Sequence, residues 1–168
     1  KYFNLVPDDV KDVYEYIGDL VRIGDTPRDR LKRVILSILY GANERSVSKI
    51  SKIDVRKVKE VKRVLCVDEF EQKLSLEYEE KGYIQNMFGR PILSNANLVN
   101  YWIQSSAVDY CCLAFKDLFQ QNKELNLHAV IHDAVLFSSP LTFEKKLESI
   151  KSLEVKGLSI PVEIKLIS

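Results

Sequence analysis

Four side chains recur at every fourth position of one segment and could together hold a nucleotide. They are Arg28, Lys32, Leu36 and Tyr40. An α-helix turns by about 100° per residue, so side chains four positions apart form one slanting stripe. The two cations could neutralise a triphosphate, and the two following residues could support a base. An ordinary amphipathic helix, with a solvated basic end and two residues entering a core, explains the same spacing.

A carboxylate between two apolar runs is a second candidate for chemistry. His132 and Asp133 separate the runs at 127–131 and 134–137, which predict a β-hairpin with this dipeptide at its tip. A carboxylate in so apolar a stretch is costly unless a cation or hydrogen-bond donors meet it. Mg²⁺ is such a cation, because it binds one or two carboxylates together with substrate phosphates. Asp133 is therefore a candidate metal ligand.

Two amides, Asn100 and Gln104, lie one helical turn apart in a long apolar segment. Buried amides need hydrogen-bond partners. A neighbouring backbone could supply them, and so could a bound ligand.

The elements that position these residues begin with a helix over 26–41. Thr26 is a good N-cap, Pro27 suits the first helical position, and Asp29 lies favourably in the first turn. Gly41 can close the helix in a left-handed conformation. The apolar spacing before and after this helix predicts further elements. An amphipathic helix over 7–22 should pack beneath the helix over 26–41, and one or two basic-faced helices over 44–66, a helix over 70–83 and a hairpin over 82–93 with its turn at 89–91 should follow. The rest of the chain predicts a largely buried helix over 95–121, a helix over 141–153 and an edge-like strand over 158–167.

Composition narrows the class of protein. The 168 residues, 46% hydrophobic, suffice for one globular domain with a good core. No stretch approaches the roughly 18 apolar residues of a membrane span, and the amino terminus lacks a signal peptide's apolar core. The cysteines, Cys66, Cys111 and Cys112, match no metal or disulfide spacing, so we expect reduced core thiols and a cytoplasmic protein without membrane partners.

Charge is distributed unevenly along the chain. Residues 28–63 hold twelve Lys or Arg against four acidic residues, a balance of +8, whereas the remainder carries −7 of the total of +1. A basic block beside an acidic remainder favours a polyanion partner at one face. A solvated helix surface is the alternative.

The first motif carries a family resemblance. Arg28-x3-Lys32-x3-Leu36-x3-Tyr40-Gly41 resembles motif B, the fingers helix of family A DNA polymerases, the DNA polymerase I class. The resemblance implies that the four stripe residues bind dNTP and that Lys32 acts in catalysis. The family usually has Phe or Tyr at the position of Leu36.

Two later motifs follow in the family's order. Asn100-x3-Gln104 resembles a palm motif whose amides contact the primer–template minor groove. His132-Asp133 resembles motif C, in which the Asp holds catalytic metal and the His lies near the primer end. Many members have Glu where this chain has Ala134. The resemblance implies two Mg²⁺ ions in the complete active site.

The family resemblance implies an α+β fold, with a helical fingers subdomain inserted on a palm-type layer and an antiparallel β-hairpin carrying His-Asp. Within a single polymerase-core piece, residues 1–80 would be fingers-like and residues 81–168 palm-like. The implied activity is DNA-directed DNA synthesis, the transfer of a nucleotide from dNTP to a primer 3′-hydroxyl by a two-metal mechanism.

Motif A, which supplies the family's first catalytic Asp, has no counterpart in residues 1–25. We therefore expect an upstream polymerase segment, in cis or in trans, to complete the site, with primer–template DNA and dNTPs as the other partners. A viral or plasmid source would fit the compact, divergent motifs. Two alternatives stay open: a single-subunit RNA polymerase-like fragment, and a non-catalytic polymerase-derived nucleic-acid-binding protein.

Overall fold

The computed structural model describes residues 7, 10–131 and 133–165. The chain forms two compact units, Lys1–Ile103 and Gln104–Ser168, and the boundary between them falls inside one long helix. Each unit has its own cluster of buried apolar side chains. The functional division near residue 80, into fingers-like and palm-like parts, stays a prediction.

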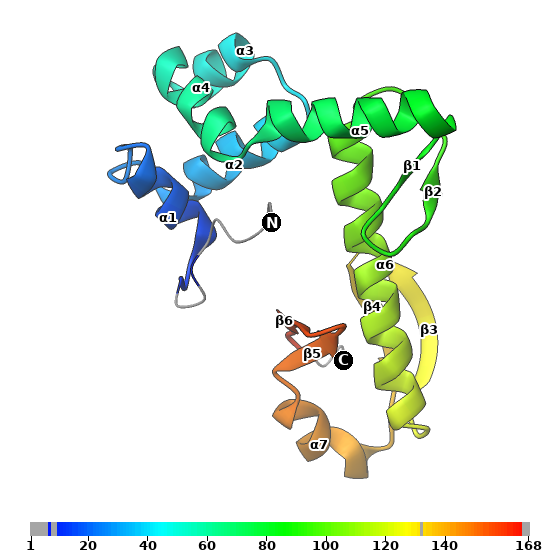
Figure 1. Cartoon of the computed structure of the whole chain (residues 1–168). Helices are drawn as coiled ribbons and strands as arrows, with labels where there is room; N and C mark the ends of the chain where they lie inside the picture. Colours follow the sequence, from blue (N-terminus) through cyan, green and yellow to red (C-terminus); the bar gives the residue numbers. More distant parts are fainter. Residues whose placement is uncertain (1–6, 8–9, 132, 166–168) are drawn as a thin grey trace. The chain divides into compact units, whose positions relative to one another are not determined.

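Five helices build most of the described part of the first unit. They are α1 (Val13–Leu20), α2 (Arg28–Leu39), α3 (Glu44–Ser51), α4 (Val55–Val64) and α5 (Val67–Lys81) (Figure 1). Helix α2 contacts α1, α3 and α4. The two basic-faced helices expected over 44–66 are therefore present, and Cys66, at φ 51°, separates α4 from α5.

Helix α1 is shorter than the sequence predicted, because Asp12 caps it. The Asp12 side chain accepts hydrogen bonds from the backbone N–H groups of Tyr14 and Glu15, which are donors that a starting helix leaves unpaired. The predicted packing of this helix against α2 is confirmed. A Cβ built on Gly18 would come within 2.8 Å of a Leu31 methyl carbon, so the missing side chain permits this close approach.

Helix α2 starts one residue later than the capping signals predicted. Pro27, not Thr26, is the N-cap, and its carbonyl accepts hydrogen bonds from Arg30 and Leu31. The predicted left-handed closure is confirmed, since Gly41 has φ 81°. Its N–H donates to Ile38 O at 3.0 Å, while Ala42 N–H donates to Ser37 O at 2.9 Å, which is the Schellman pattern.

After α5, a short hairpin leads into the long helix. Strands β1 (Ile84–Gln85) and β2 (Pro91–Ile92) pair antiparallel, so the predicted hairpin is present, but Pro91 is already a paired strand residue rather than part of the turn. Helix α6 (Leu98–Gln121) follows. Trp102 of α6 donates a hydrogen bond to Gln85 O at 2.9 Å and packs edge-on against Phe70, with ring centroids 5.0 Å apart.

The expectation that α6 is largely buried is wrong. Tyr101 is 43% exposed and Val108 is 50% exposed, although Val99 and Ala114 are buried. An apolar circumference predicts burial only where other elements cover every side, and the described elements cover some sides of α6 and not others.

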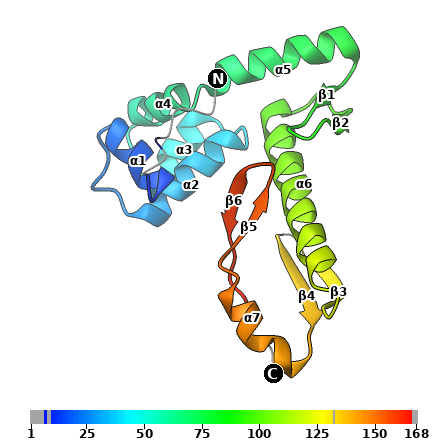
Figure 2. The ribbon, with the colours of Figure 1, turned by 60° about the horizontal axis from the view of Figure 1, so that its bottom comes forward.

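The second unit, in which the carboxyl-terminal part of α6 lies beside two hairpins, is drawn in Figure 2. Strands β3 (Asn126–Ile131) and β4 (Ala134–Ser138) pair antiparallel with a register shift between Leu127 and Ala129. Phe119 of α6 meets Phe137 of β4 edge-on, with centroids 5.8 Å apart, in the small core of this unit.

The last predicted helix and strand are placed differently in the structure. A 3₁₀ turn, η1 (Leu141–Phe143), and α7 (Glu144–Ser149) replace the helix over 141–153, and β5 (Ser152–Val155) pairs with β6 (Leu158–Pro161). Lys156 and Gly157 both have positive φ, as in the two-residue type I′ turn that favours hairpins. This turn draws residues 152–155 into a strand.

The described strands form three separate two-stranded antiparallel sheets rather than one continuous layer. The structure therefore confirms a mixed helix and sheet fold, while the fingers-on-palm arrangement stays a prediction. The cysteine thiols are unpaired, as expected, but the prediction that all lie in the core is wrong, since Cys112 is exposed. Within the described residues, every helix is too short or too polar to traverse a lipid bilayer.

Candidate functional site

The stripe on α2 is an exposed face of a helix whose other side is buried. Arg28 and Lys32 are exposed, Tyr40 is 44% exposed, and Leu36 is partly buried. The opposite side of the helix supplies the core residues Leu31, Val34, Ile35 and Ile38. Tyr40 therefore does not enter the core as an ordinary amphipathic helix would require, and its ring is accessible to a ligand.

Arg28 is held by two residues of the α1 amino terminus. Its Nε–H donates to Asp12 Oδ2, and its guanidinium lies over the Tyr14 ring, 5.3 Å from the centroid. The hydrogen bond from Arg28 holds the pKa of Asp12 below its ordinary value, and the same bond raises the pKa of Arg28. Arg28 thus stays charged and anchored while its side chain remains 48% exposed.

Lys32 differs from Arg28 in its surroundings. It is exposed, and no carboxylate among the described residues forms an ion pair with it. An exposed, uncompensated ammonium one turn from an anchored guanidinium can attract and bind an anion such as a phosphate group.

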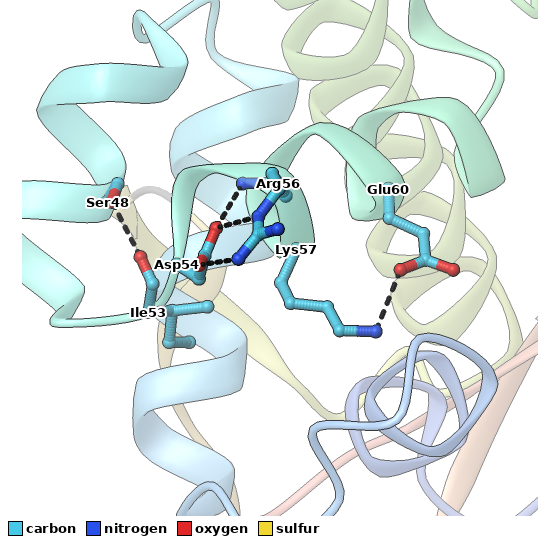
Figure 3. Close-up of polar contacts among 6 residues, drawn as sticks. All are labelled: Ser48, Ile53, Asp54, Arg56, Lys57 and Glu60. Atoms are coloured by element: carbon cyan, nitrogen blue, oxygen red, sulfur yellow. Dashed lines mark hydrogen bonds and ion pairs between the residues drawn. The ribbon is translucent and has the colours of Figure 1, made fainter.

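The basic block is partly neutralised inside the first unit. Lys57 bonds Glu60 at 3.0 Å, and Arg56 bonds Asp54 at 3.0 Å (Figure 3). Lys62 lies 2.6 Å from Asp68, and this acid raises the pKa of Lys62. With Arg28, four of the block's twelve cations are paired. The other eight have no ion pair with a described acid, so the block keeps an excess of accessible positive charge.

The two amides of α6 have different environments. Gln104 is exposed. Asn100 Oδ1 is buried without a hydrogen-bond partner among the described atoms, so the backbone partner considered from the sequence is not observed for this oxygen. Asn100 lines a hollow of about 270 Å³ together with Gly41 and Asn97, next to the carboxyl end of α2. An unpaired buried oxygen beside an open hollow can accept a hydrogen bond from a ligand or from water.

Asp133 lies between β3 and β4, where Ile131 pairs with Ala134. It is exposed, so the argument that its apolar neighbours desolvate it is wrong. His132, the other predicted residue of this motif, lies outside the described residues. The described part of the chain contains no group of three His, Cys, Asp or Glu side chains able to enclose a metal ion. Asp133 by itself offers one oxygen ligand that Mg²⁺ can use.

The stripe on α2 and Asp133 belong to different units, so their meeting in one site stays a prediction. The two residues that hold Arg28, Asp12 and Tyr14, are not among the site residues predicted from the sequence. An Asp just before an apolar-periodic helix is a capping signal and could have located the α1 terminus, but nothing in the spacing reveals that it pairs with Arg28.

Comparisons with known proteins identify what the chain is similar to. The DNA polymerase of Mycobacterium phage D29 is 29% identical over 132 residues, and that of Mycobacterium phage L5 is 28% identical over 138 residues. The matches take in 73% and 77% of this chain but only 22% and 23% of the phage proteins, so the chain spans less than a quarter of their length. No family model matches the sequence.

A solved structure resembles the fold of the chain. The POL domain of Pol1 from M. smegmatis, in complex with DNA primer-template and dNTP, matches with a TM-score of 0.60 over 83% of this chain and 30% of that one, at 15% identity. The resemblance to a DNA polymerase of the polymerase I type, predicted from the motifs, is therefore confirmed. The roles of the individual motif residues stay predictions.

Proposed function

We propose that this chain carries the nucleotide-binding helix and one metal ligand of a template-directed DNA polymerase. The reaction is nucleotidyl transfer from a dNTP to a primer 3′-hydroxyl by a two-metal mechanism. The observation that carries the proposal is the stripe on α2, whose cations and aromatic ring are exposed on a helix with a buried opposite face, in a chain similar to phage DNA polymerases.

Each stripe residue has a role that fits its surroundings. Arg28, anchored through Nε, and Lys32, without a carboxylate partner among the described residues, bind and neutralise the triphosphate. Lys32 also stabilises the charge that develops on the departing pyrophosphate. Leu36 and the exposed ring of Tyr40 support the base.

The DNA contacts belong to α6 and to the β3–β4 connection. Asn100 and Gln104 contact the primer–template, and His132 lies near the primer end. The free Oδ1 of Asn100 supports this role, because it can accept a hydrogen bond from a base edge. The unpaired cations of the basic block supply sequence-independent attraction for phosphates.

Asp133 is the proposed Mg²⁺ ligand, and its exposure fits that role. A hard carboxylate oxygen at an accessible turn can bind Mg²⁺ together with phosphate oxygens and water. When bound, the two ions activate the primer hydroxyl and stabilise the leaving pyrophosphate. A second carboxylate, from a motif A segment supplied in cis or in trans, completes the proposed pair of sites. A phage-encoded enzyme acting in the host cytoplasm is the setting that the relatives favour.

Nucleotide binding can be tested on the chain itself by calorimetric titration with dATP and Mg²⁺. Lys32→Ala should weaken binding by about tenfold or more, the effect expected for one charge-assisted contact to phosphate. Lys123→Ala, which removes an exposed lysine of the second unit, is the control and should bind as the unmodified chain does. Equal affinities for the two variants would contradict the assignment of the stripe.

Catalysis can be tested by primer extension with the chain alone and with a motif A segment added. We expect extension only in the second case, and we expect Asp133→Asn to abolish it while dATP binding persists. A non-catalytic nucleic-acid-binding protein would bind DNA in a salt-sensitive manner yet be indifferent to Asp133→Asn in every assay. Incorporation of rNTP in preference to dNTP would favour the RNA polymerase alternative.

A further inference from the structure

We propose that Asp12 is a positioning residue, which holds the guanidinium of Arg28 by its Nε–H so that the terminal N–H groups are ordered for a triphosphate. This inference rests on the proposed function of the α2 stripe. It adds Asp12 to the nucleotide site, a residue sixteen positions before Arg28 in the chain that acts through Arg28 and does not contact the phosphates.

The two oxygens of Asp12 have different tasks. Oδ1 accepts hydrogen bonds from Tyr14 N at 2.9 Å and from Glu15 N at 3.1 Å, which fixes the carboxylate on the first turn of α1. Oδ2 accepts from Nε of Arg28. Because the carboxylate is fixed by the helix cap and is only 19% exposed, Oδ2 is an anchor of defined position rather than a mobile surface charge.

Tyr14 restrains the same guanidinium from a second direction. Its ring lies under the Arg28 guanidinium at 5.3 Å, in the distance range of a cation–π contact. Arginine has five N–H donors, of which Nε–H is one. No acceptor among the described residues takes the four N–H groups on the terminal nitrogens of Arg28. Those four donors point from an anchored group and are available to a phosphate.

Asp12 could instead oppose anion binding through its negative charge. Salt distinguishes the two effects, because interactions between exposed charges are screened over a Debye length of about 10 Å at 0.1 M ionic strength. The ordering of a side chain before it binds is not screened. A gain in affinity from removing the negative charge should therefore shrink as salt is added, whereas a loss of affinity caused by the missing anchor should not turn into a gain at any salt concentration.

The decisive variant is Asp12→Asn. An asparagine retains the capping oxygen, and Asn is as good an N-cap as Asp. It replaces Oδ2 with an NH₂ group, which meets Nε–H donor to donor. We expect inorganic triphosphate and dATP to bind about two- to tenfold more weakly, the range expected when one side chain must be immobilised on binding. The urea midpoint at neutral pH should fall slightly, because the ionised carboxylate that pairs with Arg28 is lost.

Asp54→Asn is the matched control. Asp54 caps α4 through Arg56 N at 2.7 Å and pairs with the Arg56 side chain, so the substitution removes the same kind of contact away from the stripe (Figure 3). Because it frees Arg56 and leaves the Arg28 anchor intact, it should not weaken triphosphate binding. A second pair of variants tests the ring, since Tyr14→Phe should retain more affinity than Tyr14→Leu.

The outcomes separate this inference from the function on which it rests. If Lys32→Ala weakens triphosphate binding while Asp12→Asn binds equally or more tightly, the positioning role is wrong and the nucleotide site stands. If neither variant changes the affinity, or if the chain binds no triphosphate, the nucleotide site itself is wrong and the inference falls with it.

Discussion

Replacing Gly41 by alanine tests whether the left-handed closure of α2 holds the end of the stripe in place. Gly41 has φ 81°, a conformation that costs an L-residue about 1–2 kcal/mol. Its new Cβ would also lie 3.3 Å from Asn97 Oδ1, which is a tight contact. We therefore expect Gly41→Ala to lower the free energy of unfolding by about 1–2 kcal/mol from the backbone alone, with a further loss from the displaced Asn97.

Gly82→Ala is the matched comparison. Gly82 ends α5 with φ 75°, and a Cβ there would meet nothing within 4 Å. It carries the same backbone cost without the contact, so Gly41→Ala should be the more destabilising of the two. Because Gly41 adjoins Tyr40, only Gly41→Ala should also weaken dATP binding.

The assay is urea unfolding followed by the fluorescence of Trp102, the single tryptophan. Trp102 packs against Phe70 within the first unit, where both glycines lie, so its emission reports on the unit that is perturbed. If Gly41→Ala has the same urea midpoint as the unmodified chain, the argument from φ is refuted. A larger loss for Gly82→Ala would refute the argument from the Asn97 contact.

Two further predictions concern pH and the last hairpin. Folding lowers the pKa of Glu44, through a hydrogen bond to its own backbone N–H and then Lys62, and lowers the pKa of Glu60 through Lys57. The stabilisation from both carboxylates is therefore present above the unfolded pKa, near 4.3 for Glu, and should be lost as pH falls below it. Urea midpoints measured between pH 7 and pH 3 would show this loss, and Glu44→Gln should make the midpoint depend less on pH. Lys156→Asn should stabilise the β5–β6 hairpin by about 0.5 kcal/mol or more, because Asn tolerates positive φ in an Asn-Gly turn. The amides of β5 and β6 should then exchange hydrogen more slowly, and faster exchange would contradict this prediction.

Local patterns were enough to predict most helices of the first unit. The period of buried residues located α2 to α5, because such a pattern depends only on the repeat of the helix. The closing Gly41 was correct for the same local reason. The first residue of α2 was missed by one, because Thr26 and Pro27 are both good starting residues and only the observed backbone distinguishes them.

Burial and long-range pairing could not be predicted in this way. The apolar circumference of α6 says nothing about which sides other elements cover, so Tyr101 and Val108 were wrongly expected inside. The exposure of Asp133 was missed for a similar reason, since flanking apolar residues on a hairpin do not enclose the residue between them.

The sequence by itself determined the stripe, because Arg28, Lys32 and Tyr40 share a face on any regular helix with this spacing. Only the tertiary structure decided how Arg28 is held. Its partner Asp12 precedes it by sixteen residues, and the two meet because α1 packs closely on α2 where Gly18 admits Leu31. Helical periodicity is a property of neighbouring residues, whereas that ion pair depends on the packing of two helices, which no spacing along one chain segment specifies.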